Sequence, residues 1–157
     1  MHQIHTQVDI HAGASLVWTL LTDFSRYPDW NPTIRGVQGP LEAGSTIRVA
    51  ERLVQPKPGK PPTVTQTTGT LDQIREPRRL SWSARLGFML GSERRFRIEN
   101  LPDGGVRFHQ EERIGGLLAP LLWRRLVRER EPAFERMNRA LKSRAERAEA
   151  RAPRTNG

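Results

Sequence analysis

Residues 117–150, near the end of the chain, read LLAPLLWRRLVREREPAFERMNRALKSRAERAEA, a pattern typical of one long helix. Apolar side chains recur along it at helical spacing and would share one face; they are Leu118, Leu122, Leu126, Ala133, Met137 and Leu141. Pro120 suits the first helical turn, where its missing N–H costs nothing. We therefore expect one amphipathic helix that needs a single apolar surface to pack against.

The residues before this helix supply such a surface, because they read almost wholly as strands. Turn signals such as Gly39-Pro40 and Pro102–Gly105 separate stretches rich in alternating apolar residues. We predict seven strands, at Ile4–Ile10, Ile34–Gln38, Thr46–Val54, Val64–Ile74, Arg79–Leu86, Arg94–Glu99 and Val106–Ile114. The segment Leu86–Gly91 is apolar and bounded by glycine, and is predicted to form a flexible lip rather than a strand.

Two short helical pieces, Ala14–Leu21 and Ser25–Tyr27, interrupt the strands after the first one. A rigid corner follows at Pro28–Pro32, where the prolines fix the backbone and Asn31 should hydrogen-bond its own loop. A sheet of this size with one amphipathic helix must curve around it to bury both apolar faces. The predicted fold is α+β, with a curved antiparallel sheet of about seven strands wrapped around the long C-terminal helix. A space between such layers is suited to a small ligand.

Composition limits the remaining possibilities. The length fits a single domain at residues 1–148, and the basic polar tail at 149–157 is predicted to be disordered. The chain has no cysteine, hence no disulfide or thiolate nucleophile, and no apolar run long enough to span a membrane. The first residues, Met1–His5, lack a secretory signal pattern. We expect a soluble cytoplasmic protein, as a monomer or weak dimer.

The net charge of +9 is unevenly distributed. Residues 116–157 hold 11 basic and five acidic side chains, a net of +6. Such a helix could attract acidic partners or an anionic membrane, but a solvated outer face with i,i+4 ion pairs explains the same pattern more simply. No aromatic residue follows Phe134, so the segment lacks the interleaved aromatics that favour nucleic acid. We therefore expect no specific nucleic-acid partner.

Several motifs taken together resemble the START/Bet v 1-like (SRPBCC) superfamily, and more narrowly its bacterial polyketide cyclase/dehydrase-like group. The resemblance covers residues 3–147 and is carried by Phe24–Pro32 (FSRYPDWNP), Leu80–Trp82 (LSW), Gln110–Glu112 (QEE) with Gly115–Pro120 (GGLLAP), and Phe134–Leu141 (FERMNRAL). It implies a helix-grip fold with a deep apolar cavity, but no single reaction. Relatives often have a Glu-His pair where this chain has Glu93-Arg94, so a titratable imidazole is replaced by a permanent cation.

Strand alternation indicates which side chains face the predicted cavity. Gln110 and Glu112 share a face with Phe108, and Arg94 shares one with Phe96, whereas His109 falls on the outward face. We expect Arg94 and Glu112 to form an ion pair that either fixes the strand register or lets Arg94 bind a carboxylate, phenolate or enolate. The full set of cavity candidates is Trp82, Phe88, Arg94, Phe96, Phe108, Gln110, Glu112 and Leu122.

No catalytic set is recognised in the sequence. His109 and Glu111 could begin a metal site, but no third ligand is visible, so we expect no metal and no cofactor. The leading hypothesis is a carrier or sensor of a small hydrophobic or aromatic ligand. It would enter between Leu86–Gly91, the loop at 55–62 and the start of the long helix. The alternatives are a cyclase/dehydrase-type enzyme that uses the same cavity, and a surface binder that uses the basic helix.

Overall fold

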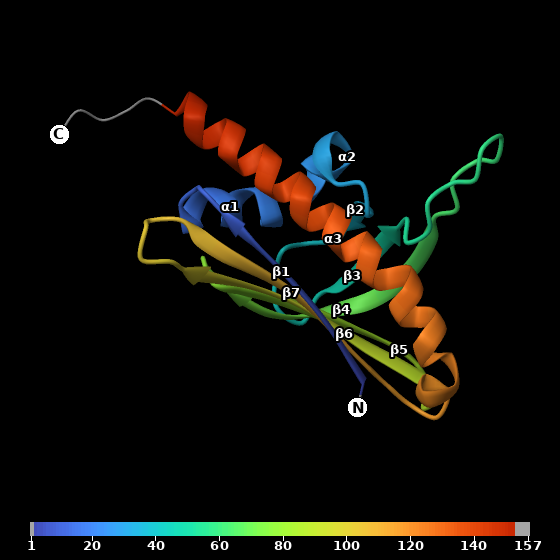
Figure 1. Cartoon of the computed structure of the whole chain (residues 1–157). Helices are drawn as coiled ribbons and strands as arrows, with labels where there is room; N and C mark the ends of the chain where they lie inside the picture. The colour runs from blue at the N-terminus through green and yellow to red at the C-terminus, as the bar shows by residue number, and fades with distance from the viewer. Residues whose placement is uncertain (1, 153–157) are drawn as a thin grey trace.

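The computed structural model describes residues 2–152, which contain one seven-stranded antiparallel sheet. Its strands are β1 (His2–Ile10), β2 (Ile34–Gln38), β3 (Thr46–Glu51), β4 (Thr65–Arg75), β5 (Arg79–Leu86), β6 (Leu90–Asn100) and β7 (Val106–Gly115). They lie in the order β1-β7-β6-β5-β4-β3-β2. Strands β2 to β7 therefore follow one another as a meander, and β1 returns to pair with β7 (Figure 1).

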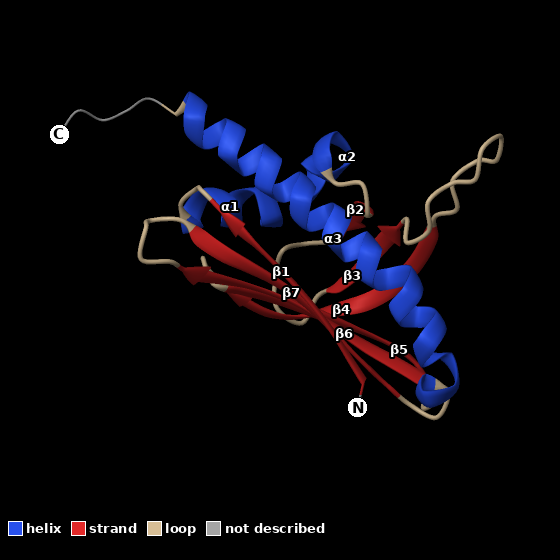
Figure 2. Ribbon diagram, in the orientation of Figure 1, coloured by secondary structure: helices blue, strands red, loops and turns tan. Residues whose placement is uncertain are grey.

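The helices lie together on one side of the curled sheet (Figure 2). Helix α1 (Ala14–Thr22), the 3-10 turn η1 (Phe24–Arg26) and helix α2 (Tyr27–Trp30) connect β1 to β2, and α3 (Ala119–Arg151) follows β7. This arrangement confirms the predicted helix-grip fold. None of the helices described is both long and apolar enough to cross a membrane.

The two halves of α3 are buried to different extents. Its buried side chains are Ala119 at the start and then Ala133, Phe134, Met137, Asn138, Leu141 and Ala145. Met137, Leu141 and Ala145 join the main core with the aromatic and aliphatic residues of α1, η1 and the sheet. Residues 120–132 include no fully buried side chain; Trp123, Leu126 and Val127 pack, partly buried, against a smaller cluster formed by Ile4, Ile114, Ala119 and Phe134.

The corner after α2 behaves as predicted from its sequence. The Asn31 side-chain oxygen accepts hydrogen bonds from the backbone N–H groups of Thr33 (3.0 Å) and Ile34 (2.8 Å). The Thr33 hydroxyl donates to the Ala133 carbonyl at 2.6 Å. The corner is thereby tied to the middle of α3.

Two sequence predictions need correction at the edges of elements. Strand β6 begins at Leu90 rather than Arg94, and only Gly87–Met89 form the turn that we expected to span Leu86–Gly91. Gly87 has a φ of +54°, which allows a tight hairpin, and Leu86 pairs with Leu90 directly. At the other end, α3 continues through Arg151, so the start of the predicted tail is helical; residues 153–157 lie outside the described residues.

Candidate ligand-binding cavity

A cavity of about 480 Å³ lies between the sheet and the first half of α3, beside the smaller apolar cluster. Strands β3 to β7 and two helix residues contribute its lining: Val49, Glu51, Gln66–Gly69, Trp82, Ala84–Leu86, Leu90–Ser92, Arg94, Glu112, Ile114, Leu126 and Arg130. The tightly packed second half of α3 closes off the other end of the fold. The cavity therefore lies at the end of the fold that the second half of α3 does not cover.

One wall of the cavity is apolar because strand alternation places every second residue inward. Trp82, Ala84 and Leu86 line it from β5, and Leu90 and Ile114 continue it on β6 and β7. The Trp82 ring is tilted against Phe96, with ring centroids 5.1 Å apart. This packing fixes the indole as a rigid face of the cavity.

The inner end of the cavity holds two arginines and two glutamates. Arg94 Nη2 lies 2.7 Å from Glu51 Oε1 and 3.8 Å from Glu112 Oε2. Arg130 Nη1 donates to both Glu112 oxygens, at 2.8 and 3.0 Å. These four residues, here called the charge cluster, carry no net charge together. Buried carboxylates are each matched by a cation, which is what their burial requires.

Arg94 is the most constrained member of the charge cluster. Its side chain is only 3% exposed, and its guanidinium carbon lies 4.2 Å from the centre of the Phe134 ring. Burial alone would lower the pKa of Arg94, but the negative charges of Glu51 and Glu112 and the hydrogen bond to Glu51 raise it above its usual value. Arg94 is therefore a permanent cation in this site.

The Arg94 guanidinium is only partly satisfied by these neighbours. Its Nε and Nη1 groups are shielded from solvent and have no hydrogen-bond acceptor among the described residues. Buried N–H donors normally have an acceptor, and an unmatched one costs free energy. A further oxygen within hydrogen-bond distance of these groups would supply the missing acceptor.

Three of the eight predicted cavity residues line the cavity, namely Trp82, Arg94 and Glu112. The predicted Arg94–Glu112 pair is present, because the two residues are register partners on β6 and β7. Phe96, Phe108 and Gln110 are buried below the cavity, where Gln110 Nε2 contacts Met137 Sδ at 3.6 Å. Helix α3 packs directly onto that part of the sheet, so these side chains cannot reach an open space.

Phe88 and Leu122 also lie outside the cavity lining. Phe88 projects from the β5–β6 turn and is 75% exposed, while Leu126, one helical turn beyond Leu122, takes the expected place. Residues 55–62 do not line the cavity either; the loop between β3 and β4 projects away from the sheet (Figure 1). Residues 66–69 of β4 form that side of the cavity instead.

Sequence reasoning missed Glu51 and Arg130. A signal for Glu51 existed, since it continues the alternating inward positions Ile47 and Val49 of β3. Arg130 lies one turn before the buried Phe134 and one turn after Leu126, which places it on the inner helix face. Charged side chains at such positions are usually solvated, so the pattern alone does not mark either residue as part of a cavity.

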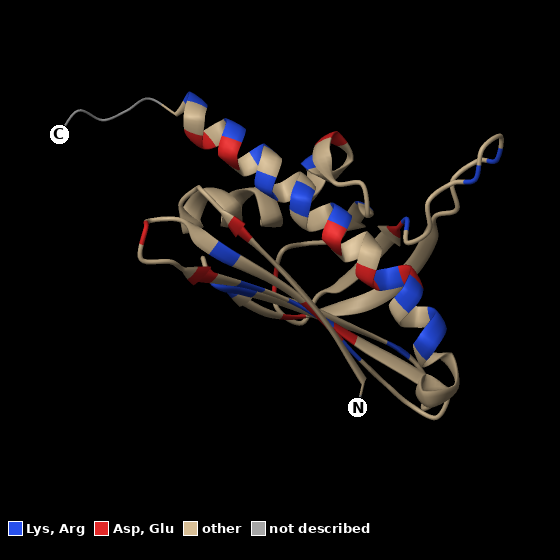
Figure 3. Ribbon diagram, in the orientation of Figure 1, with Lys and Arg blue, Asp and Glu red and all other residues tan. Residues whose placement is uncertain are grey.

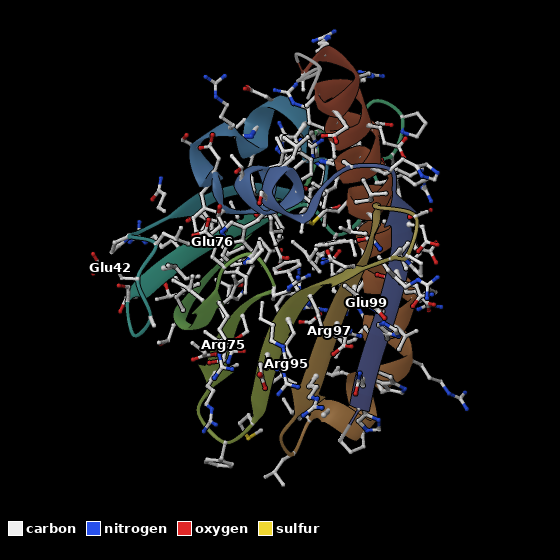
Figure 4. The ribbon with its side chains drawn as sticks, turned by 90° about the vertical axis from the view of Figure 1, so that its left-hand side faces the viewer. Glu42, Arg75, Glu76, Arg95, Arg97 and Glu99 are labelled. Carbon is white, nitrogen blue, oxygen red and sulfur yellow. The ribbon has the colours of Figure 1, made fainter. Side chains whose placement is uncertain are left out.

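The opposite face of the sheet carries a separate polar network. Odd-numbered β6 residues, including Arg95 and Arg97, point to that face (Figure 4). His109 lies there, as predicted; it is 5% exposed and contacts His5 (3.0 Å) and Glu99 (2.9 Å). Within residues 2–152, no three His, Asp or Glu side chains are grouped so as to hold a metal ion.

Comparison with known protein families identifies the family of this chain. Residues 1–146 match the family described as polyketide cyclase/dehydrase and lipid transport. The chain belongs to this family. The match confirms the resemblance seen in the sequence motifs. Comparison with curated protein sequences gave no match.

Several solved structures share the fold of this chain. The Zhui aromatase/cyclase from a Streptomyces species has a TM-score of 0.71 at 18% identity, with 96% of each chain covered. A START superfamily protein from Mycobacterium smegmatis has a TM-score of 0.67 at 19% identity, with 94% of this chain and 99% of that chain covered. At such identities the likeness concerns the fold alone.

Proposed function

We propose that this protein binds and carries a small, largely apolar molecule beneath the first half of α3, with Arg94 holding an oxygen atom of that molecule. The cavity volume of about 480 Å³ falls in the usual range of small-molecule sites, roughly 300–1,000 Å³. Its walls combine apolar side chains with a few convergent polar groups. That combination gives affinity from apolar burial and orientation from hydrogen bonds.

The observation that carries the proposal is the incomplete hydrogen bonding of the Arg94 guanidinium. Arg94 lines the inner end of the cavity, and two of its N–H groups lack an acceptor within residues 2–152. A carbonyl, carboxylate or phenolate oxygen of a bound molecule would supply that acceptor. The negative charges of Glu51 and Glu112 are already matched within the charge cluster, so they need no cation from the ligand.

Native mass spectrometry of freshly purified protein tests this proposal. A discrete added mass should accompany the wild-type chain, and denaturing extraction should release the compound for identification. Ala84→Phe, which fills the cavity without touching the charge cluster, should lose the adduct, and Leu41→Phe on the surface should keep it. An adduct retained by Ala84→Phe, or none on the wild type, would contradict the proposal.

An enzyme of the cyclising or dehydrating type is the second candidate, and one observation favours it. The same unmatched N–H groups of Arg94 could stabilise negative charge on an enolate oxygen. Proton abstraction also needs a base, however, and both cavity carboxylates accept hydrogen bonds from arginines. Incubating the extracted compound with the protein separates the two functions: an unchanged mass supports carriage, and loss of water or a new isomer supports catalysis.

A further inference from the structure

The end of the molecule beside the cavity carries a cluster of exposed apolar side chains. Leu86 and Phe88 of the β5–β6 hairpin are 69% and 75% exposed, and Leu117 and Leu121 at the start of α3 are 70% and 79% exposed. We call these four residues the apolar tip. Such exposure of large apolar side chains in one place is unusual for a protein surface that contacts only water.

The two segments that form the apolar tip are held together by the backbone. The Leu117 N–H donates to the Phe88 carbonyl at 3.4 Å, and the Leu118 N–H donates to the Met89 carbonyl at 2.9 Å. The β5–β6 turn and the start of α3 lie next to each other at the lower edge of Figure 4. The tip is thus one connected surface, not two independent loops.

The apolar tip is also the rim of the cavity. Leu86 is exposed at the tip and lines the cavity, and Leu90 and Leu126 continue the apolar lining inward. A molecule that left the cavity at this end would pass directly across the tip.

Positive charge surrounds the apolar tip. Residues 84–92 and 113–128 contain no aspartate or glutamate and five arginines: Arg85, Arg113, Arg124, Arg125 and Arg128. Acidic residues beyond these ranges partly offset two of them, since Arg125 pairs with Glu129 at 2.9 Å and Arg113 lies opposite Glu93 in the sheet. In Figure 3, blue segments that mark arginines colour the ribbon of the lower part of α3. Apolar side chains flanked by arginines match an anionic bilayer, whose headgroups attract the cations while its acyl region accepts the apolar groups.

A second copy of the chain fits this surface less well. Symmetric dimers use the same patch on both subunits, so the arginines around one tip would face those around the other. Like charges at an interface oppose association, whereas an anionic surface is attracted by all of them. The charge pattern therefore favours an anionic partner.

We propose that the apolar tip and its five arginines dock the protein on an anionic membrane surface, with the rim of the cavity facing the lipid. The bilayer would then be the phase from which an apolar ligand is loaded or into which it is released. Docking itself needs no ligand in the cavity, so it can be tested apart from the function proposed above.

Sedimentation with phosphatidylcholine vesicles, with and without phosphatidylglycerol, tests this docking. The wild type should bind the anionic vesicles and not the neutral ones, and binding should fall as salt is raised. Phe88→Ser/Leu121→Ser and Arg124→Gln/Arg128→Gln should each weaken binding by about tenfold or more. Thermal melting should show that both pairs fold, because all four side chains are exposed.

Matched controls separate the tip from general charge and hydrophobicity. Leu41→Ser/Val64→Ser removes exposed apolar side chains elsewhere, and Arg139→Gln/Arg147→Gln removes the same charge from the far half of α3. Both should bind like the wild type. The proposal is overturned if the wild type ignores anionic vesicles or if the controls weaken binding as much as the tip variants. It is also overturned if Phe88→Ser/Leu121→Ser abolishes a concentration-dependent dimer while vesicle binding persists.

Discussion

Arg94 on β6 and Glu51 on β3 are hydrogen-bonded at 2.7 Å although two strands, β5 and β4, lie between theirs. In a flat sheet, strands at that separation are about 14 Å apart, beyond the reach of these two side chains. The pair can form only because the sheet curls, and it joins the two sides of the concave surface. The contact is therefore both part of the cavity and a brace of the fold.

Removing one residue of the Arg94–Glu51 pair should lower the stability of the protein strongly. We predict that Arg94→Ala lowers the free energy of unfolding by about 3–5 kcal/mol, because it leaves the buried Glu51 carboxylate without its cation. Arg97→Ala, on the exposed face of the same strand, should change it by less than about 0.5 kcal/mol. Urea unfolding of both variants provides the comparison, and equal effects would contradict this role of Arg94.

Replacing the Arg94–Glu51 pair by apolar residues should be much less damaging. In Arg94→Met/Glu51→Met no buried charge loses its partner, since Arg130 still matches Glu112. We expect an unfolding free energy within about 1 kcal/mol of the wild type, as found when buried ion pairs are exchanged for apolar groups of similar volume. If the double variant is as unstable as Arg94→Ala, the loss arises from packing rather than from unpaired charge.

The glycine pair between β7 and α3 should respond unequally to alanine. Gly116 has a φ of +105°, and an added Cβ would lie 2.5 Å from the Met89 carbonyl oxygen, whereas Gly115 has no atom within 4 Å of that position. We predict that Gly116→Ala destabilises the protein by about 1–3 kcal/mol and that Gly115→Ala is nearly neutral. Thermal or urea unfolding measures both, and a neutral Gly116→Ala would argue against the close contact between the hairpin and the start of α3.

Acid should weaken the anchor between the end of β1 and the second half of α3. The Lys142 ammonium and then the His11 backbone N–H donate to Glu146, and these bonds hold the pKa of that carboxyl below its usual value. Because the folded-state pKa is the lower one, the stabilisation is complete above the ordinary glutamate pKa and is lost as pH falls through the folded-state value.

The variant Glu146→Gln measures this contribution. Its unfolding free energy should be lower than that of the wild type by about 1 kcal/mol at neutral pH, and the difference should vanish in acid. Glu149→Gln, at an exposed position on the same helix, should show no such pH dependence. A Glu146→Gln effect that stays constant with pH would mean that ionisation of Glu146 is not its source.

The sequence was most informative about which side of the sheet each strand residue faces, because side chains alternate between the two faces along a strand. Alternation on β5, β6 and β7 correctly predicted that Trp82, Arg94 and Glu112 face the concave side. The three residues are also opposite one another on adjacent strands. The contact between Arg94 and Glu51 depends on how strongly the sheet curls, which no local pattern reports. For the same reason, alternation could not show that Phe96 and Phe108 are enclosed in the main core whereas Trp82, in the same core, also lines the cavity.

The most direct test of the proposed cavity site is a fluorescence titration with two matched probes. Anilinonaphthalenesulfonate and N-phenylnaphthylamine share their aromatic rings, but only the first has an anionic oxygen group. The wild type should bind both at one saturable site, the sulfonate more tightly, and Arg94→Met/Glu51→Met should remove that preference. Ala84→Phe should abolish binding of both probes. Undiminished binding to Ala84→Phe would place the probes outside the cavity and contradict the proposed ligand site.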